Sequence, residues 1–177
     1  MYMLPLLVSA LSVNLLHGYL LFSQRFERKE TISEHAAKHR QTHMLYIIGH
    51  TIGAVGFSLF AKQFFYEKHH ARLLMVFVII GAIAEIIQAI LPARGKYKKT
   101  HELFAYTMAF MVVVVGLLAP LQIPQDNLIK TVSLILGVTV GALIVVIHLV
   151  DRRYFWMLQM AGTIIFHIEM LVLFIAG

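Results

Sequence analysis

The chain has 177 residues, of which 59% are hydrophobic and only 14% are charged. Soluble domains are about 45–50% apolar and 25% charged, so this composition excludes an ordinary soluble protein and is typical of an integral membrane protein. The chain has no cysteine, which excludes disulfides and thiolate metal sites, and its net charge of +6 comes from basic residues between apolar segments. There the charge indicates orientation in a membrane, and we expect no nucleic acid as a partner.

Six segments are long and apolar enough to cross the hydrocarbon core of a bilayer, which takes about 20 helical residues. In chain order they are about residues 2–22, 44–66, 71–91, 101–120, 129–150 and 154–175. The first has neither a basic stretch before it nor a small-residue cleavage site after it, so we expect a retained span rather than a signal peptide. Short connections make consecutive helices antiparallel neighbours. The sequence predicts one domain over 1–177, an all-α integral membrane protein with six transmembrane helices in an up-down bundle.

Lys and Arg residues are unevenly divided between the two ends of the spans. Eleven of them lie in the loops 23–43, 92–100 and 151–153, and four lie at the opposite ends. The positive-inside rule places the first group in the cytoplasm. We therefore expect a multi-pass protein of a bacterial-type cytoplasmic membrane, with the N- and C-termini outside and anionic lipid against the basic 23–43 loop.

A histidine-rich stretch leads into the second span. Thr31 and Glu34 have the T-x-x-E spacing of a capping box, and neither Gly nor Pro follows before Gly49. The pattern predicts one continuous helix from residue 31 through His50. On that helix one narrow face carries His35, His39, His43 and His50. The first three of these are more typical of a solvated or headgroup-facing surface than of a metal site.

Polar side chains gather in the cytoplasmic third of five spans. An ionisable group in hydrocarbon costs about 2.5–3.5 kcal/mol, so such groups normally face the bundle interior and pair with one another. Glu85 is the most costly unless it is paired or protonated, and His17 and His50 lie at a matching depth. The predicted polar cluster consists of Asn14, His17, His50, Glu85, Gln88, His101 and His148. A structural hydrogen-bond cluster and a ligand site are both open interpretations of it.

The last span has a separate polar face. Gln159, Thr163 and His167 are spaced i, i+4 and i+8, whereas Glu169 points about 200° away from His167. Glu169 is therefore expected to face another helix, and the sequence names no partner for it.

Two pairs of glycines have the G-x-x-x-G spacing that lets helices approach closely. They are Gly49 with Gly53 and Gly137 with Gly141. Their expected role is packing inside the bundle, and self-association of two chains is the alternative.

Three kinds of function fit the His and Glu residues. The first is a non-enzymatic binding, transport or accessory component, whose cluster recognises a small polar or cationic group or relays protons. The second is an electron-transfer protein with one haem b held by His17 and His50 as axial ligands. The third is a membrane hydrolase with a divalent metal on the same residues. We favour the first, because the chain has no Ser or Cys nucleophile motif and no Gly-rich phosphate-binding loop. The haem alternative is weakened by comparison with membrane cytochromes of the b561 type, which place two His pairs at two depths. Beyond His17 and His50, this chain offers only His167 at a second depth.

Two short segments resemble an uncharacterised bacterial family of six-span membrane proteins. The segments are TISE after the first span and ILPARGKYKKTHELFAY between the third and fourth spans. The matching positions are Ser33, Glu34, Pro92 and His101. The resemblance covers roughly residues 31–120. It implies six helices and no particular activity.

Overall fold

The computed structural model describes residues 3–22, 30–147, 149–151 and 154–177. The α-helices of these residues are α1 (Met3–Phe22), α2 (Ile32–Ala36), α3 (Arg40–Ala61), α4 (Arg72–Ile90), α5 (Lys98–Gln122), α6 (Asn127–Val146) and α7 (Phe155–Ala176). A π-helical segment, η1 (Lys62–Lys68), extends α3, and a 3-10 turn, η2 (Gly95–Tyr97), precedes α5. Six of the resulting helical segments are long and apolar enough to cross a membrane. The predicted all-α, six-span membrane protein is confirmed, with span boundaries displaced by a few residues.

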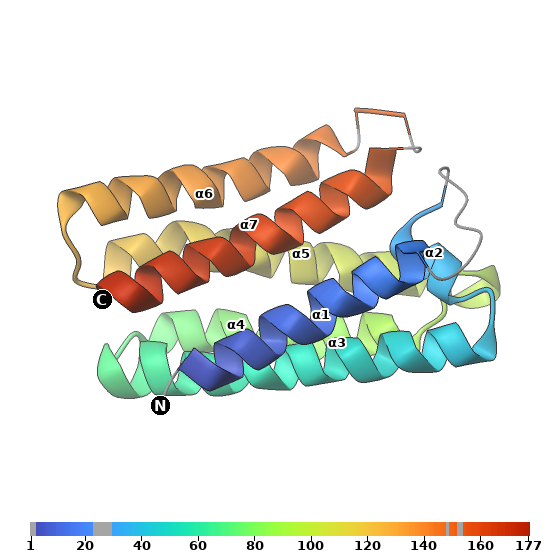
Figure 1. The fold of residues 1–177 in the computed structure, drawn as a ribbon, viewed down its shortest axis with the longest axis horizontal. Coiled ribbons are helices and arrows are strands. Elements are labelled where there is room, and N and C mark those ends of the chain that lie inside the picture. Colours follow the sequence, from blue (N-terminus) through green and yellow to red (C-terminus); the bar gives the residue numbers. More distant parts are fainter. Residues whose placement is uncertain (1–2, 23–29, 148, 152–153) are drawn as a thin grey trace.

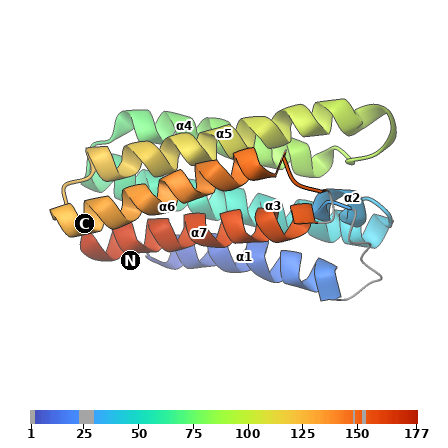
Figure 2. The same cartoon turned by 90° about the horizontal axis from the view of Figure 1, so that it is seen from above.

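The six spans form a closed ring. Each span packs against the spans before and after it in the chain, and α7 packs against α1 to complete the circle. Both termini lie at one end of the bundle, and the short helix α2 lies at the other end (Figures 1 and 2). This arrangement follows from six antiparallel helices joined by short connections. All six helices therefore contribute side chains to one interior.

The outward faces of the spans are apolar. Large hydrophobic side chains on every span are exposed, among them Leu15, Leu59, Ile83, Phe110, Ile135 and Ile175. In water such a surface would be far larger than the apolar patches that soluble monomers tolerate. In a bilayer the same side chains face lipid, which leaves the polar side chains for the interior.

The histidine-rich stretch is not one continuous helix, and that prediction is wrong. The capping box of Thr31 and Glu34 is present and starts α2. However, α2 ends at Ala36, and His39 is extended (φ −128°, ψ 144°) as the N-cap of α3. The Thr42 hydroxyl donates to the carbonyls of Ala36 (2.7 Å) and His39 (2.9 Å), so the break leaves these acceptors satisfied.

The break changes where the ladder histidines lie. It lets α2 turn across the end of the bundle, where Ile32 and Ala36 pack with Leu20 and Tyr46 in one apolar cluster. His35 is buried, whereas His39 is exposed, and the ring of His43 contacts the Ala89 carbonyl at 3.1 Å. The expected single histidine face is therefore absent from this part of the described chain.

Ion pairs hold α2 against the loop between α4 and α5. Arg94 donates to the Glu34 carbonyl and to the Glu30 carboxylate, both at 3.0 Å. Lys98 reaches the Glu34 carboxylate at 3.1 Å, and Lys38 reaches Glu30 at 2.6 Å. Exposed ion pairs contribute only about 0–1 kcal/mol each, so their main effect is to fix the position of α2.

Both glycine faces are used inside the chain. A Cβ at Gly49 would lie 2.6 Å from Leu16 of α1, and one at Gly53 would lie 2.5 Å from Val13. A Cβ at Gly137 would lie 2.8 Å from the carbonyl oxygen of Gly116 on α5. Helices α1 and α5 therefore cover the two faces, and self-association through them stays a prediction.

Candidate functional site: a central cavity with a Glu–His–His chain

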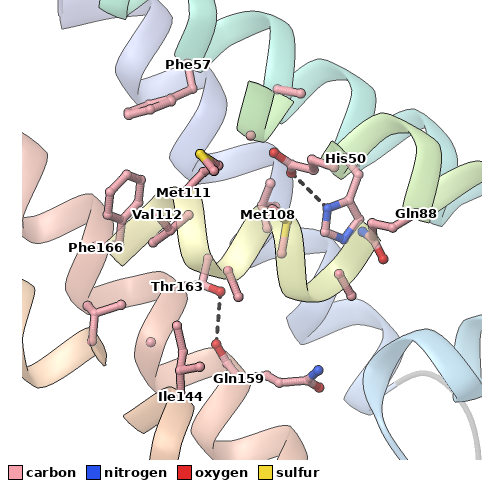
Figure 3. Close-up of a pocket in the computed structure, with 18 of the residues that line it drawn as sticks. His50, Phe57, Gln88, Met108, Met111, Val112, Ile144, Gln159, Thr163 and Phe166 are labelled. Carbon is pink, nitrogen blue, oxygen red and sulfur yellow. Dashed lines mark hydrogen bonds and ion pairs between the residues drawn. The ribbon is translucent and has the colours of Figure 1, made fainter. Parts of the chain in front are cut away.

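A cavity of about 260 Å³ lies at the centre of the ring. All six spans line it, and most of its surface is apolar. Figure 3 shows His50 and Gln88 on one side, with Thr163 and Gln159 of α7 on another and Met108 of α5 near the middle. An apolar cavity with a few convergent polar groups is the usual form of a small-molecule site.

A chain of three polar side chains joins α4, α3 and α1 at this cavity. Oε1 of Glu85 lies 2.9 Å from Nδ1 of His50. Nε2 of His50 lies 3.3 Å from Nε2 of His17. The two imidazoles are 4–6% exposed and all three residues line the cavity. The structure thus brings together the three residues that the depth argument had singled out.

The bonding pattern determines the tautomers of both rings when they are neutral. A carboxylate only accepts hydrogen bonds, so Nδ1–H of His50 donates to Glu85 and Nε2 of His50 carries the lone pair. His17 must then donate through Nε2–H, which leaves its Nδ1 as an acceptor. Nδ1 of His17 is buried and has no hydrogen-bond partner among the described residues. The chain therefore ends in an unused acceptor on a residue that lines the cavity.

Two more polar residues, Tyr46 of α3 and Gln88 of α4, lie beside His50 towards the end of the bundle that carries α2. The Tyr46 ring lies against the His50 ring, with centroids 4.2 Å apart. The Tyr46 hydroxyl lies 3.3 Å from Oε1 of Gln88, and both side chains are buried. Gln88 thus holds the Tyr46 hydroxyl by hydrogen bonding, and the Tyr46 ring supports the His50 imidazole by contact.

His101 is close to this group but has a different role. Its Nδ1–H donates to the carbonyls of Gln88 and Leu91, both at 2.8 Å. These are carbonyls at the C-terminal end of α4, which lack partners within the helix. His101 therefore caps α4 and fastens the start of α5 to it, and its ring also lines the cavity.

The remaining members of the predicted cluster lie elsewhere. Asn14 donates to the Ala10 carbonyl of its own helix at 2.7 Å and lines a second, smaller pocket between α1 and α7. It does not line the central cavity. His148 lies outside the described residues.

The polar face of α7 meets the same cavity. Gln159, Thr163 and His167 all line it. Nδ1 of His167 contacts the Thr163 carbonyl at 2.8 Å, and its Nε2 lies 3.5 Å from the Ser9 hydroxyl of α1. Glu169 points away, as its angular position predicted, and is fully buried outside the cavity.

The geometry does not provide an open position for a metal or a haem iron. His17 and Glu85 are each bonded to His50, and the described residues hold no group of three His, Asp or Glu side chains placed around a common metal position. Two imidazoles on one haem iron stand on opposite faces of the porphyrin, whereas here their Nε2 atoms are 3.3 Å apart. Haem b or a divalent metal would require the imidazoles to separate, and both stay predictions from the sequence.

Sequence reasoning missed Tyr46 and Ser9. Tyr46 is four residues before His50, one helical turn away on the same face, and that spacing could have identified it. Ser9 and His17 are eight residues apart on α1, which also places them on one face. Both signals are weak, since Tyr and Ser are common in membrane helices.

Comparison of the chain with family models, with curated proteins and with solved structures gives no match. The resemblance to an uncharacterised six-span family stays a prediction, and the functional argument depends on the geometry of the cavity.

Proposed function

We propose that this protein binds a small lipophilic amine, or a similar organic cation, in its central cavity and relays a proton along the Glu85–His50–His17 chain. It acts as a binding or transport component of the membrane and not as an enzyme. The observation that supports this most directly is that Nδ1 of His17, a residue that lines the cavity, is buried and has no partner among the described residues. A ligand with an N–H group would satisfy this acceptor.

The charge of the cavity favours a cation. Among the described residues, Glu85 is the only acidic residue that lines the cavity, and none of the described Lys or Arg residues lines it. With neutral histidines the lining carries one negative charge. The apolar body of an amine would lie against the aromatic rings of Phe57, Phe77 and Phe166, whose faces also attract cations.

The chain provides a complete route for one proton. A proton that binds Nδ1 of His17 turns the ring into an imidazolium, which releases its Nε2 proton to Nε2 of His50. His50 then releases its Nδ1 proton to Glu85. One proton has moved from Nδ1 of His17 to the Glu85 carboxylate, both imidazoles are neutral again, and each has changed its tautomer. Such Glu–His chains are the usual elements of proton paths in membranes.

Three probes of similar shape test the proposal by thermal unfolding of the purified protein in detergent. Benzylamine offers a charge and N–H donors, benzyltrimethylammonium offers a charge alone, and benzyl alcohol offers a donor alone. Saturation of one site at about 100 Kd adds about 2.7 kcal/mol of stability. For a chain of this length that raises Tm by roughly 5–10 °C. We expect benzylamine to raise Tm most.

Matched variants identify the site. Glu85→Gln should remove most of the benzylamine effect, because it removes the negative charge of the cavity. Glu67→Gln is the control, since Glu67 is exposed and its ion pair with Lys62 at 3.6 Å lies far from the cavity. No stabilisation by benzylamine, or equal stabilisation in Glu85→Gln and the parent, would contradict the proposal.

The membrane and its orientation belong to the same proposal. The uneven distribution of Lys and Arg residues supports a bacterial-type cytoplasmic membrane, with the Lys- and Arg-rich loops inside and both termini outside. Within this loop, Lys38 is paired with Glu30, which also pairs with Arg94. Contact of the 23–43 loop with anionic lipid therefore depends on Arg40 and on the basic residues at 25, 28 and 29, which lie outside the described residues.

A further inference from the structure

Glu169 lies where α5, α6 and α7 cross, and none of its surface is exposed. A Cβ at Gly116 of α5 would lie 2.9 Å from Oε2 of Glu169, and a Cβ at Gly137 of α6 would lie 3.3 Å from Oε1. The carboxyl group thus occupies a notch that exists because both residues are glycine. A carboxyl packed this tightly against two helices leaves no room for a hydrated ion.

The notch offers Glu169 no hydrogen-bond donor. Both carboxyl oxygens are buried without a partner among the described residues. The Ser133 hydroxyl is also buried without a described partner, and it lies one turn before Gly137 on the same face of α6. A carboxylate ion in such surroundings would be strongly destabilised, since its hydration is replaced by neither a donor nor a cation.

We propose that Glu169 is a second proton-binding site in the membrane-spanning bundle, occupied by a proton in the packing of α5, α6 and α7 described here. This site is separate from the Glu85–His50–His17 chain and does not depend on the function proposed for the cavity. A proton is the ligand that fits, because it neutralises the carboxyl without requiring space. The protonated carboxyl also gains an O–H donor that the Ser133 hydroxyl or a main-chain carbonyl could accept.

No other ionisable group of the described residues is in contact with the Glu169 carboxyl. His167 is on the same helix but bonds Thr163 and faces Ser9 of α1. The ionisable residues of the helices packed against α7 are His17 and Tyr19 on α1, Lys98, Lys99, His101, Glu102 and Tyr106 on α5, and Lys130 on α6. Those on α5 lie at least ten residues, about 15 Å, from Gly116 along the helix, and Lys130 lies seven residues, about 10 Å, from Gly137.

Loss of this proton would act on the cavity. A carboxylate in the notch needs water or a cation, so α5 must separate from α6 and α7 to admit one. Val115 is next to Gly116 and Val140 is one turn after Gly137, and both line the cavity. Proton release at Glu169 therefore widens the wall that α5 and α6 form, which links the two sites mechanically.

Infrared spectroscopy of the purified protein tests the site directly. Ordinary carboxyl groups ionise near pH 4, so at neutral pH a carbonyl stretching band of a protonated carboxyl should come from a group such as Glu169. We expect one such band in the parent chain, its loss in Glu169→Gln and its persistence in the control Glu67→Gln. Absence of the band from the parent, or its persistence in Glu169→Gln, would overturn the proposal.

Two further measurements keep the test decisive if Glu169→Gln does not fold. In Glu169→Asp the band should remain but shift in frequency, because the shorter side chain changes the surroundings of the same proton. In the parent chain the band should be the same in sodium chloride and in choline chloride at one pH. A band that disappears only with sodium would overturn the proton assignment in favour of a sodium site.

Discussion

The Nε2 atoms of His17 and His50 lie 3.3 Å apart, so the two imidazoles bond directly to each other within the bundle. Each ring can supply one donor and one acceptor when it is neutral. The acidic end of the chain is fixed by the 2.9 Å contact between His50 and Glu85, and the free end is Nδ1 of His17. This order gives the chain a direction along the cavity wall, from Nδ1 of His17 towards Glu85.

The three residues of the chain should act as one unit. We expect the effects of His17→Ala and Glu85→Gln on the free energy of unfolding to be non-additive, with a coupling of about 0.5–3 kcal/mol, because both act through His50. Unfolding of the single and double variants in detergent measures this coupling. The control pair is Glu85→Gln with Glu67→Gln, which should be additive within about 0.5 kcal/mol. Full additivity of His17→Ala with Glu85→Gln would show that no network joins them.

The break between α2 and α3 should depend on the Thr42 hydroxyl. Thr42→Val keeps the shape of the side chain but removes the donor to the Ala36 carbonyl, which costs about 1–3 kcal/mol, while the His39 carbonyl keeps the His43 amide as its donor. Hydrogen exchange across 36–43 should become faster. Thr131→Val is the control, since its hydroxyl bonds the Asn127 carbonyl on an exposed helix face. Equal, small effects in both variants would mean that Thr42 does not stabilise the break.

The spans could be predicted because a bilayer leaves few alternatives. Lipid requires every backbone group to be bonded within the segment, so apolar stretches of about 20 residues become helices whatever their other features. The contact between Glu85 and His50 followed from the same logic, because a charge at that depth needs a partner.

Other features could not be predicted, because they depend on helix rotation and packing. Asn14 and Ser9 lie on opposite sides of His17 around α1, at about 60° and 80°, and only Ser9 lines the cavity, whereas Asn14 lines the pocket between α1 and α7. The break after Ala36 has no Gly or Pro to indicate it, and it depends on a hydroxyl six residues later. The notch around Glu169 needs Gly116 and Gly137 from two other helices, and no spacing in the sequence relates them.

His35 should make the position of α2 sensitive to acid. Burial lowers the pKa of His35 below its ordinary 6.5. The hydrogen bond to Glu30 raises this pKa, and the positive charge of Lys38 lowers it further. The unfolded segment therefore binds a proton more readily than the folded one, and stability present above about pH 6.5 is lost as the pH falls towards the folded pKa. Hydrogen exchange of 33–38, corrected for intrinsic rates, should increase in mild acid. His35→Gln should show no such increase, and an unchanged increase there would assign the effect to another group.

The orientation of the bundle can be measured at two positions. Eleven Lys and Arg residues against four predict that a reporter after Gly177 is outside the cell and one inserted at Lys96 is inside. Paired reporters active only in the periplasm or only in the cytoplasm would show this. A cytoplasmic Gly177 would reverse the orientation, while the fold, in which both termini lie at one end, would be unaffected (Figure 1).

Gly56 should be the least replaceable glycine of the face that α3 presents to α1. A Cβ there would lie 2.9 Å from the Pro5 carbonyl oxygen and 3.1 Å from the Ser9 nitrogen, which are backbone atoms that can move only with the whole of α1. Gly56→Ala should therefore destabilise the bundle by about 1–3 kcal/mol. Gly18→Ala is the control, because nothing lies within 4 Å of a Cβ at Gly18.

Thermal unfolding and the oligomeric state of the two glycine variants distinguish packing inside the chain from self-association. If α1 covers the glycine face, Gly56→Ala lowers Tm and leaves the oligomeric state unchanged. If a second copy covered it instead, Gly56→Ala would shift the population towards monomer while the Tm of the monomer stayed that of the parent. A Gly56→Ala protein with the Tm and oligomeric state of Gly18→Ala would contradict the close approach of α1 and α3, and with it the position of Ser9 beside the cavity.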